Sequence, residues 1–321
     1  TLGEDGIFKK AKDAADRMQN AVSNEKIQIG ELTNELTEVM EKDEIGADIY
    51  VTLYDDGTLT FGTQNEPIEG KTVIKEYGNI KGEEYTSWNE GDEHFNDTPW
   101  FNEKETITKV SIIDEIVPTS MANWFESCSN LTEIIGLEKI NTEYVENMNA
   151  MFAHCNTLNS IDVSSFDTSN VTNMHDMFLD CTNLIEIKGL ENFNTSKVTD
   201  MGGMFGRCNS LTSVNVSGFD TGNVETMSNM FLDCSSLTNL NVNNFNTVNV
   251  ENTASMFYGC TNLKDIDISS FNTSNMIRMD SMFANCKSLV VIYVGENWDL
   301  SNVENTLDMF ANCGTDKTTL K

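Results

Sequence analysis

Hydrophobic positions recur along this chain with a period of about 26 residues. The unit that begins at Met151 reads MFAHCNTLNSIDVSSFDTSNVTNMHD, and units with the same pattern begin at residues 204, 230 and 256. Units that begin at residues 124, 177 and 282 carry one extra residue, and an eighth, incomplete unit begins at Met309. A fixed period of this length indicates a stacked array in which each unit buries its apolar side against its neighbours.

Two shorter spacings occur inside each unit. Met174, Met177, Phe178 and Cys181 follow the i, i+3, i+4, i+7 spacing that predicts one apolar stripe on a short helix. The apolar positions that follow the cysteine match the L-x-x-L-x-L strand signature of leucine-rich repeats. We therefore predict an α/β repeat solenoid of the leucine-rich-repeat type, with a short strand and a short helix in each rung. Stacked about 4.8 Å apart, the strands of seven units would form one face roughly 30–35 Å long.

A polar turn separates the predicted strand from the predicted helix. Asp and Asn side chains in such turns form hydrogen bonds with nearby backbone groups. One turn position is occupied by Asp167, Asn194, Asp220, Asn246, Asn272 and Asp299. Another, three residues later, is occupied by Asn170, Asn223, Asn249, Asn275 and Asn302, with Lys197 as the exception.

These units resemble the 26-residue repeats of the BspA-like leucine-rich repeat surface proteins of bacteria. The resemblance covers roughly residues 105–313 and rests on the recurring motifs M-F-x-x-C-x-x-L and F-D-T-S-N-V. Ile140 and Trp298 stand where the family has Phe, and Trp124 stands where it has Met. The resemblance implies exposure at the cell surface and adhesion or host interaction, without implying a particular ligand.

The region before the repeats divides into two parts. Residues 1–45 show a heptad spacing of apolar residues, which predicts one long amphipathic helix. The opening from Leu2 to Lys12 resembles the segment just beyond the membrane helix of type IV pilin-like proteins, so this helix would be a pilin-like stalk. We expect residues 46–104 to form a small β-rich cap and residues 105–321 to form the solenoid.

Alternating strands in the cap region flank an Asp55-Asp56-Gly57 turn, which predicts a hairpin. Further strands are expected at residues 71–80 and 107–113, and the polar stretch from Gly82 to Asn102 is expected to be a surface loop. Such a cap would cover the apolar end that an open solenoid exposes.

Charge and cysteine spacing narrow the function. The formal net charge of −31 argues against nucleic acid as a partner, because its binders carry basic patches. The cysteines recur once per unit, and identical positions on parallel rungs point the same way, so we expect buried free thiols rather than disulfides. No spacing indicates a catalytic triad, a phosphate loop or a zinc site, and we predict neither an enzyme nor a bound metal or cofactor.

The residue between the second and third apolar strand positions is the candidate for recognition. Side chains alternate along a strand, so this residue points away from the core. It varies while the framework repeats, which fits a recognition surface and equally fits a merely solvated face. The candidate binding residues are Asp162, Lys188, Asn215, Asn241, Asp267 and Tyr293.

The sequence thus predicts an extracellular cell-surface protein that uses a repeat solenoid for adhesion, anchored by a segment upstream of Thr1. Its expected partner is a protein or glycan on a host or neighbouring cell, and self-association through the N-terminal helix is a further candidate. The alternative is a pilin-like structural subunit of an extracellular filament that displays the repeats on its surface.

Overall fold

The computed structural model describes residues 48–80 and 98–321 of the chain. The chain divides into two compact units, Thr1–Ile45 and Gly46–Lys321. The first unit, with the predicted stalk helix and the pilin-like opening, lies outside the described residues. No helix in the described ranges has the length and apolar character needed to cross a membrane.

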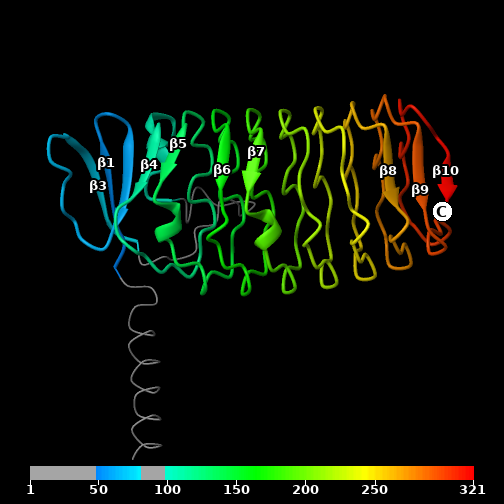
Figure 1. Cartoon of the computed structure of the whole chain (residues 1–321), viewed down its shortest axis with the longest axis horizontal. Helices are drawn as coiled ribbons and strands as arrows, with labels where there is room; N and C mark the ends of the chain where they lie inside the picture. The colour runs from blue at the N-terminus through cyan, green and yellow to red at the C-terminus, as the bar shows by residue number, and fades with distance from the viewer. Residues whose placement is uncertain (1–47, 81–97) are drawn as a thin grey trace, which may run out of the picture. The chain divides into compact units, whose positions relative to one another are not determined.

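The cap strands share a sheet with the first rungs of the solenoid (Figure 1). Strands β1 (Tyr50–Tyr54) and β2 (Thr58–Gly62) form the predicted antiparallel hairpin, and β3 (Val73–Asn79) pairs with the outer side of β1. Strand β2 lies parallel to β4 (Lys109–Ile112), and β4 lies parallel to β5 (Glu133–Ile135), so the sheet order is β3-β1-β2-β4-β5. The hairpin therefore supplies a ready-made strand edge on which the first rung stacks.

The predicted surface loop is wrong at its C-terminal end. Residues 81–97 lie outside the described residues, but Trp100 is fully buried and packs edge-on against Phe61 at 5.3 Å. Its indole N–H donates to the Trp124 carbonyl at 2.8 Å, and the 3-10 turn η1 (Phe101–Thr106) follows. Trp100 and Trp124 thus seal the cap to the first rung.

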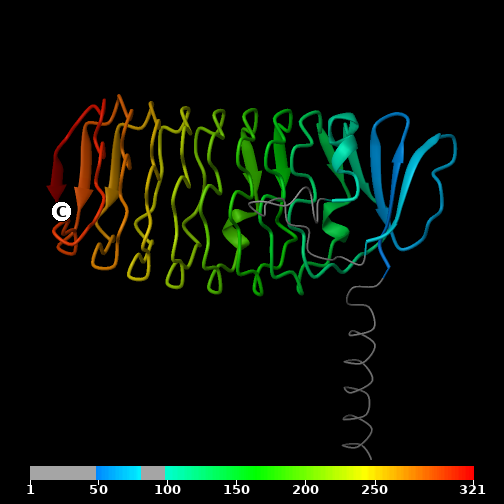
Figure 2. The same ribbon diagram turned by 180° about the vertical axis from the view of Figure 1, so that it is seen from behind.

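The remaining strands are short, parallel and one repeat apart, which Figures 1 and 2 show from opposite sides. Ser160 pairs with Glu186, and Asp265 pairs with Val291, a shift of 26 residues in each case. These strands are β5 (Glu133–Ile135), β6 (Ser160–Asp162), β7 (Glu186–Lys188), β8 (Asp265–Ile268), β9 (Val291–Val294) and β10 (Thr318–Leu320).

The predicted α/β class is wrong, because the described rungs consist of short strands or single bridges, turns and short 3-10 segments and contain no α-helix. The N–H of Phe178 donates to the Met204 carbonyl of the next rung at 2.9 Å, as in a sheet. The N–H of Met177 instead donates at 3.3 Å to the Met174 carbonyl three residues back. The same alternation continues to Cys181 and recurs in the other rungs. The structure is therefore a β-solenoid.

Left-handed residues explain why a helix cannot form there. Asp176 and Asp180 have φ values of 55° and 58°, whereas every residue of an α-helix needs a negative φ. The next rung places Gly203 and Arg207 at the same two positions, with φ values of 63° and 58°. Asp, Asn and Gly tolerate this conformation best, so the polar residues between the apolar ones make tight turns.

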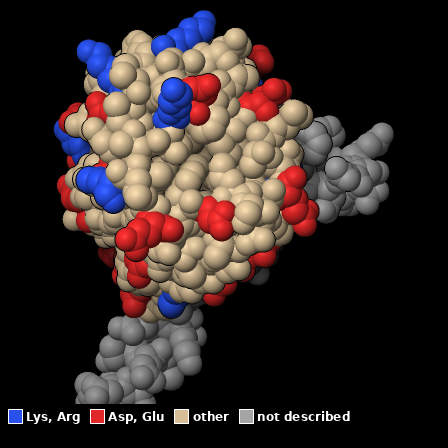
Figure 3. Space-filling model, turned by 90° about the vertical axis from the view of Figure 1, so that its right-hand side faces the viewer, with Lys and Arg blue, Asp and Glu red and all other residues tan. Residues whose placement is uncertain are grey.

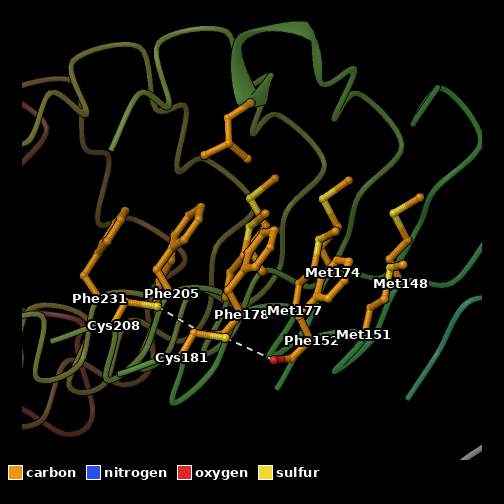
Figure 4. Close-up of a cluster of buried hydrophobic side chains, with 14 of the residues drawn as sticks. Met148, Met151, Phe152, Met174, Met177, Phe178, Cys181, Phe205, Cys208 and Phe231 are labelled. Carbon is orange, nitrogen blue, oxygen red and sulfur yellow. Dashed lines mark hydrogen bonds between the residues drawn. The ribbon is translucent and has the colours of Figure 1, made fainter. Parts of the chain in front are cut away.

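The core consists of continuous columns of identical side chains (Figure 4). The rings of Phe152, Phe178 and Phe205 stack with centroid separations of 5.5 and 5.9 Å. The Cys181 thiol donates to the Phe152 carbonyl at 3.0 Å, and the Cys208 thiol donates to the Phe178 carbonyl at 3.1 Å. All eight cysteines are free thiols, and all but the half-buried Cys313 are buried, as the sequence predicted.

The extra residue of the longer units has a visible cause. After β5 and β7, Gly136 and Gly189 take left-handed φ values of 80° and 92° and begin the 3-10 turns η2 (Leu137–Lys139) and η3 (Leu190–Asn192). A Cβ on Gly189 would lie 2.3 Å from the Ser164 backbone, so only glycine fits against the neighbouring rung.

Candidate recognition surface

All six predicted recognition residues are solvent-accessible and lie at matching positions of their rungs. The strand register places Asp162 opposite Lys188, and Asp267 opposite Tyr293. Asp267 and Tyr293 are half-buried, and the other four residues are exposed. The structure thus brings these side chains onto one face, and nothing in their placement tests whether they bind a ligand.

Four of the six residues also have a local structural role. Asp162 Oδ1 accepts hydrogen bonds from the Ser164 N–H at 3.1 Å and from the Ser164 hydroxyl at 2.6 Å. These bonds, first the hydroxyl and then the N–H, lower the pKa of Asp162. Asn215, Asn241 and Asp267 accept the same bond from the backbone N–H two residues later. These four side chains therefore stabilise an Asx turn. The sequence predicts such turns only in the segment that follows.

Lys188 and Tyr293 have no such turn bond, because they belong to the longer units. The Lys188 ammonium lies 3.7 Å from the Glu186 carboxylate. The Lys321 ammonium lies 5.8 Å from the centre of the Tyr293 ring and contacts Asp267. Of the predicted set, Lys188 is therefore the exposed residue whose side chain is least committed to the fold.

The strand-bearing face is interrupted, contrary to the continuous face expected from the repeat. The five-stranded sheet ends at β5, and β6 pairs with β7 in a separate sheet. Beyond it come a bridge between Ser213 and Asn239 and the β8-β9-β10 sheet. On the opposite side, parallel bridges link successive rungs without a break from Ser120 to Asn305. The uninterrupted backbone pairing between rungs therefore lies along the bridges from Ser120 to Asn305 and not on the strand-bearing face.

A groove of about 380 Å³ lies at the first interruption, between β5 and β6. The longer unit contributes Leu137 and Glu138 of η2 to one wall, and the shorter unit contributes Ser164 and Ser165 of its Asx turn. Lys188 reaches it from β7. The two walls of the groove therefore come from neighbouring units of different length, a feature that the consensus repeat does not reveal.

The groove combines an aliphatic floor with a polar rim. Leu137, Leu158 and Ile161 form the floor and are 5%, 1% and 6% exposed. Carboxylates from Glu138 and Asp162 lie at the rim with the serine hydroxyls. Such a surface can pack against an apolar group and accept hydrogen bonds from polar groups beside it.

His154 and His175 are half-buried and contact carboxylates of neighbouring rungs. His154 Nδ1 lies 3.0 Å from Asp180 Oδ2. His175 lies between Asp176 at 3.3 Å and Asp200 at 3.0 Å, and their hydrogen bonds, Asp176 first, raise the pKa of His175 to about 10. Within the ranges that the structure describes, no three His, Cys, Asp or Glu residues are grouped as metal ligands. These histidines join adjacent rungs.

Stacked rungs with thiol, methionine and phenylalanine columns define a β-solenoid repeat protein. The family model described as "Mycoplasma protein of unknown function, DUF285" matches residues 93–211, 119–237, 180–291 and 204–321, which together span the whole repeat array. The chain belongs to this family. No curated protein matches it.

Three solved structures, all of bacterial proteins, are similar to this chain. A leucine-rich repeat protein from Bacteroides ovatus is 18% identical, with a TM-score of 0.35 over 76% of this chain and 70% of that one. A leucine rich cell surface protein from Faecalibacterium prausnitzii is 16% identical, with a TM-score of 0.26 over 85% and 93%. A leucine-rich repeat protein from Eubacterium ventriosum is 16% identical, with a TM-score of 0.23 over 77% and 76%.

Proposed function

We propose that this chain is a cell-surface recognition protein that binds its ligand in the groove between β5 and β6. The main support for this proposal is the lining of the groove, which has an aliphatic floor and a rim of carboxylates, hydroxyls and the Lys188 ammonium. Its extracellular location and its role in adhesion are inferred from the resemblance to BspA-like repeats. The ligand class that we propose is a protein or glycan on a host or neighbouring cell.

A substitution that fills the groove tests this proposal. Ser160 is exposed on β6 and lines the groove, so Ser160→Trp blocks the groove without removing an Asx turn. Ser213 occupies the equivalent position two rungs later and does not line the groove, which makes Ser213→Trp the matched control. We expect binding of the labelled chain to cultured epithelial cells, measured by flow cytometry, to fall at least about tenfold for Ser160→Trp only.

Enzymatic treatment of the cells separates the two ligand classes. Loss of binding after protease treatment indicates a protein, and loss after glycosidase treatment indicates a glycan. If Ser160→Trp binds as well as the parent chain, the groove is not the recognition site.

A filament subunit is the alternative function. It is supported by the pilin-like opening Leu2–Lys12, which lies outside the described residues. Sedimentation of the purified chain tests it: reversible polymerisation would favour the filament, and a monomer over a wide concentration range would argue against it. The absence of an enzymatic activity stays a prediction.

A further inference from the structure

A second groove, of about 940 Å³, follows a different set of columns. One column is the amide ladder, defined here as Asn223, Asn249 and Asn275, and the other contains Thr199, Glu225 and Glu251. All six side chains are exposed. None of the groove's lining residues belongs to the strand-face groove, so the two surfaces are separate.

The amides of the ladder are held in one orientation. The Nδ2 group of each donates at 2.7 Å to a backbone carbonyl of the preceding rung. Each amide oxygen is therefore left as an acceptor at the surface, one per rung, with rungs about 4.8 Å apart. One N–H of each amide is engaged in this bond, which fixes the orientation of the side chain, so the ladder presents a row of oxygen acceptors to a donor.

The neighbouring carboxylates add negative charge in the same register. The N–H of Glu251 donates to the Glu225 carbonyl at 2.8 Å, so these two side chains lie on adjacent rungs. Like charges at adjacent positions destabilise each other. Among the described residues, neither carboxylate has a salt-bridge partner, so both are available to a cation in the groove.

Asn170 lies in the same column two rungs before Asn223 and shows one donor that such an amide oxygen accepts. Lys197 stands in the asparagine column, and its ammonium donates to Asn170 Oδ1 at 2.6 Å. A primary ammonium therefore fits the acceptor that each amide presents. A guanidinium, in contrast, is a planar fork that suits paired oxygens better than single acceptors one rung apart.

We propose that this groove binds a lysine-bearing, extended segment of a partner protein, with ammonium groups seated between the amide ladder and the Glu225 and Glu251 carboxylates. The net charge of −31 steers such a segment toward the surface, and the groove supplies the matching row of acceptors. The site is independent of the strand-face groove and of the function proposed for it.

Fluorescence anisotropy with a labelled hexalysine peptide tests the proposal on the full chain at low salt. We expect Glu225→Gln combined with Glu251→Gln to weaken binding roughly fivefold, since each removes an exposed but matched charge. The control pair, Glu133→Gln with Glu186→Gln, changes the net charge equally on the strand face and should alter binding less than about twofold. Equal weakening by the two pairs would reduce the binding to general electrostatics and overturn the proposal.

Completing the ladder provides the opposite test. Lys197→Asn adds an acceptor and frees Asn170 Oδ1, so hexalysine should bind roughly threefold more tightly than to Lys188→Asn, which removes the same charge elsewhere. Hexa-arginine should bind less tightly than hexalysine to the parent chain. Identical affinities of the two lysine variants, or a preference for hexa-arginine, would contradict an ammonium site. Ser160→Trp should leave hexalysine binding unchanged, which separates this site from the recognition groove.

Discussion

At the residue scale, buried threonines link neighbouring rungs by hydrogen bonds in addition to the contacts of the apolar columns. Thr221 is 1% exposed, and its hydroxyl donates to the Asn246 carbonyl at 3.0 Å and accepts from the Asn246 N–H at 2.7 Å. One buried hydroxyl thus pairs with two backbone groups of the next rung. The column comprises Thr142, Thr168, Thr195, Thr221, Thr247 and Thr273.

Replacing Thr221 by valine should cost stability although the two side chains have nearly the same shape. The substitution removes the hydroxyl partner of the part-buried N–H and carbonyl of Asn246, and we expect a loss of about 1–3 kcal/mol in the free energy of unfolding. Urea denaturation measures it, with the exposed Thr212→Val as the control, expected within about 0.5 kcal/mol of the parent. Equal losses for the two substitutions would mean that the hydroxyls of the buried threonine column contribute nothing to stability.

His175 makes a pH-dependent contribution to the free energy of unfolding, and the sign follows from its raised pKa. Hydrogen bonds that His175 donates to Asp176 and then to Asp200 raise its pKa from 6.5 to about 10, so the folded state holds the proton more tightly than the unfolded state. The stabilisation is complete below about pH 6.5 and is lost as the pH rises toward about 10. Solvent screens the pair, because the His175 side chain is 38% exposed. We expect His175→Gln to destabilise the chain more at about pH 6 than at about pH 10, measured by denaturation at each pH. The same loss at both would contradict the raised pKa.

At the element scale, the longer units depend on a glycine that the rung cannot replace. Gly189 has φ 92°, and an added Cβ would lie 2.3 Å from the Ser164 backbone. We expect Gly189→Ala to cost roughly 3–5 kcal/mol, because backbone strain and a clash between rungs add. Gly78 has φ 71° with open space around it, so Gly78→Ala isolates the strain and should cost about 1–2 kcal/mol. Thermal unfolding compares them, and similar costs would show that the rungs separate easily.

Some elements of the structure could be predicted from the sequence and others could not. The period predicted the stacking, the inward residues and the buried thiols, and the Asp-Gly turn predicted the cap hairpin, because each repeats or has a strong local signal. It failed for the helix, since the spacing of Met174, Met177, Phe178 and Cys181 is equally satisfied by turns with bonds to the third residue back. Asp and Asn at the intervening left-handed positions were the available signal. The groove between β5 and β6 arises from two neighbouring units, so no single repeat could predict it.

At the scale of the whole molecule, the columns make the solenoid a one-dimensional stack. Each rung contacts mainly its neighbours, so local opening should begin at an end and become rarer toward the middle. The ends differ: the cap covers Trp124, which stacks on Phe61 at 5.2 Å, whereas Leu307 and Leu320 near the other end are 69% and 68% exposed. Figure 3 views that end and shows charged side chains around its rim and an uncharged middle.

The rates of thiol modification in the 321-residue chain should reflect this difference between the two ends of the solenoid. Burial raises the pKa of Cys181 and Cys234 to about 12, so near neutral pH almost no reactive thiolate exists until a rung opens. We expect a water-soluble alkylating reagent to modify the half-buried Cys313 first and Cys286 next, with Cys208 at least about a hundredfold slower than Cys313. Timed labelling with peptide mass spectrometry gives each rate, and a denatured sample controls for intrinsic reactivity.

Cys128, beneath the cap, should react more slowly than Cys286, because the cap holds the first rung closed. Rapid labelling of Cys208 in the native chain would mean that the columns do not exclude water, whereas a gradient from the C-terminal end would show that the cap sets where the stack begins to open.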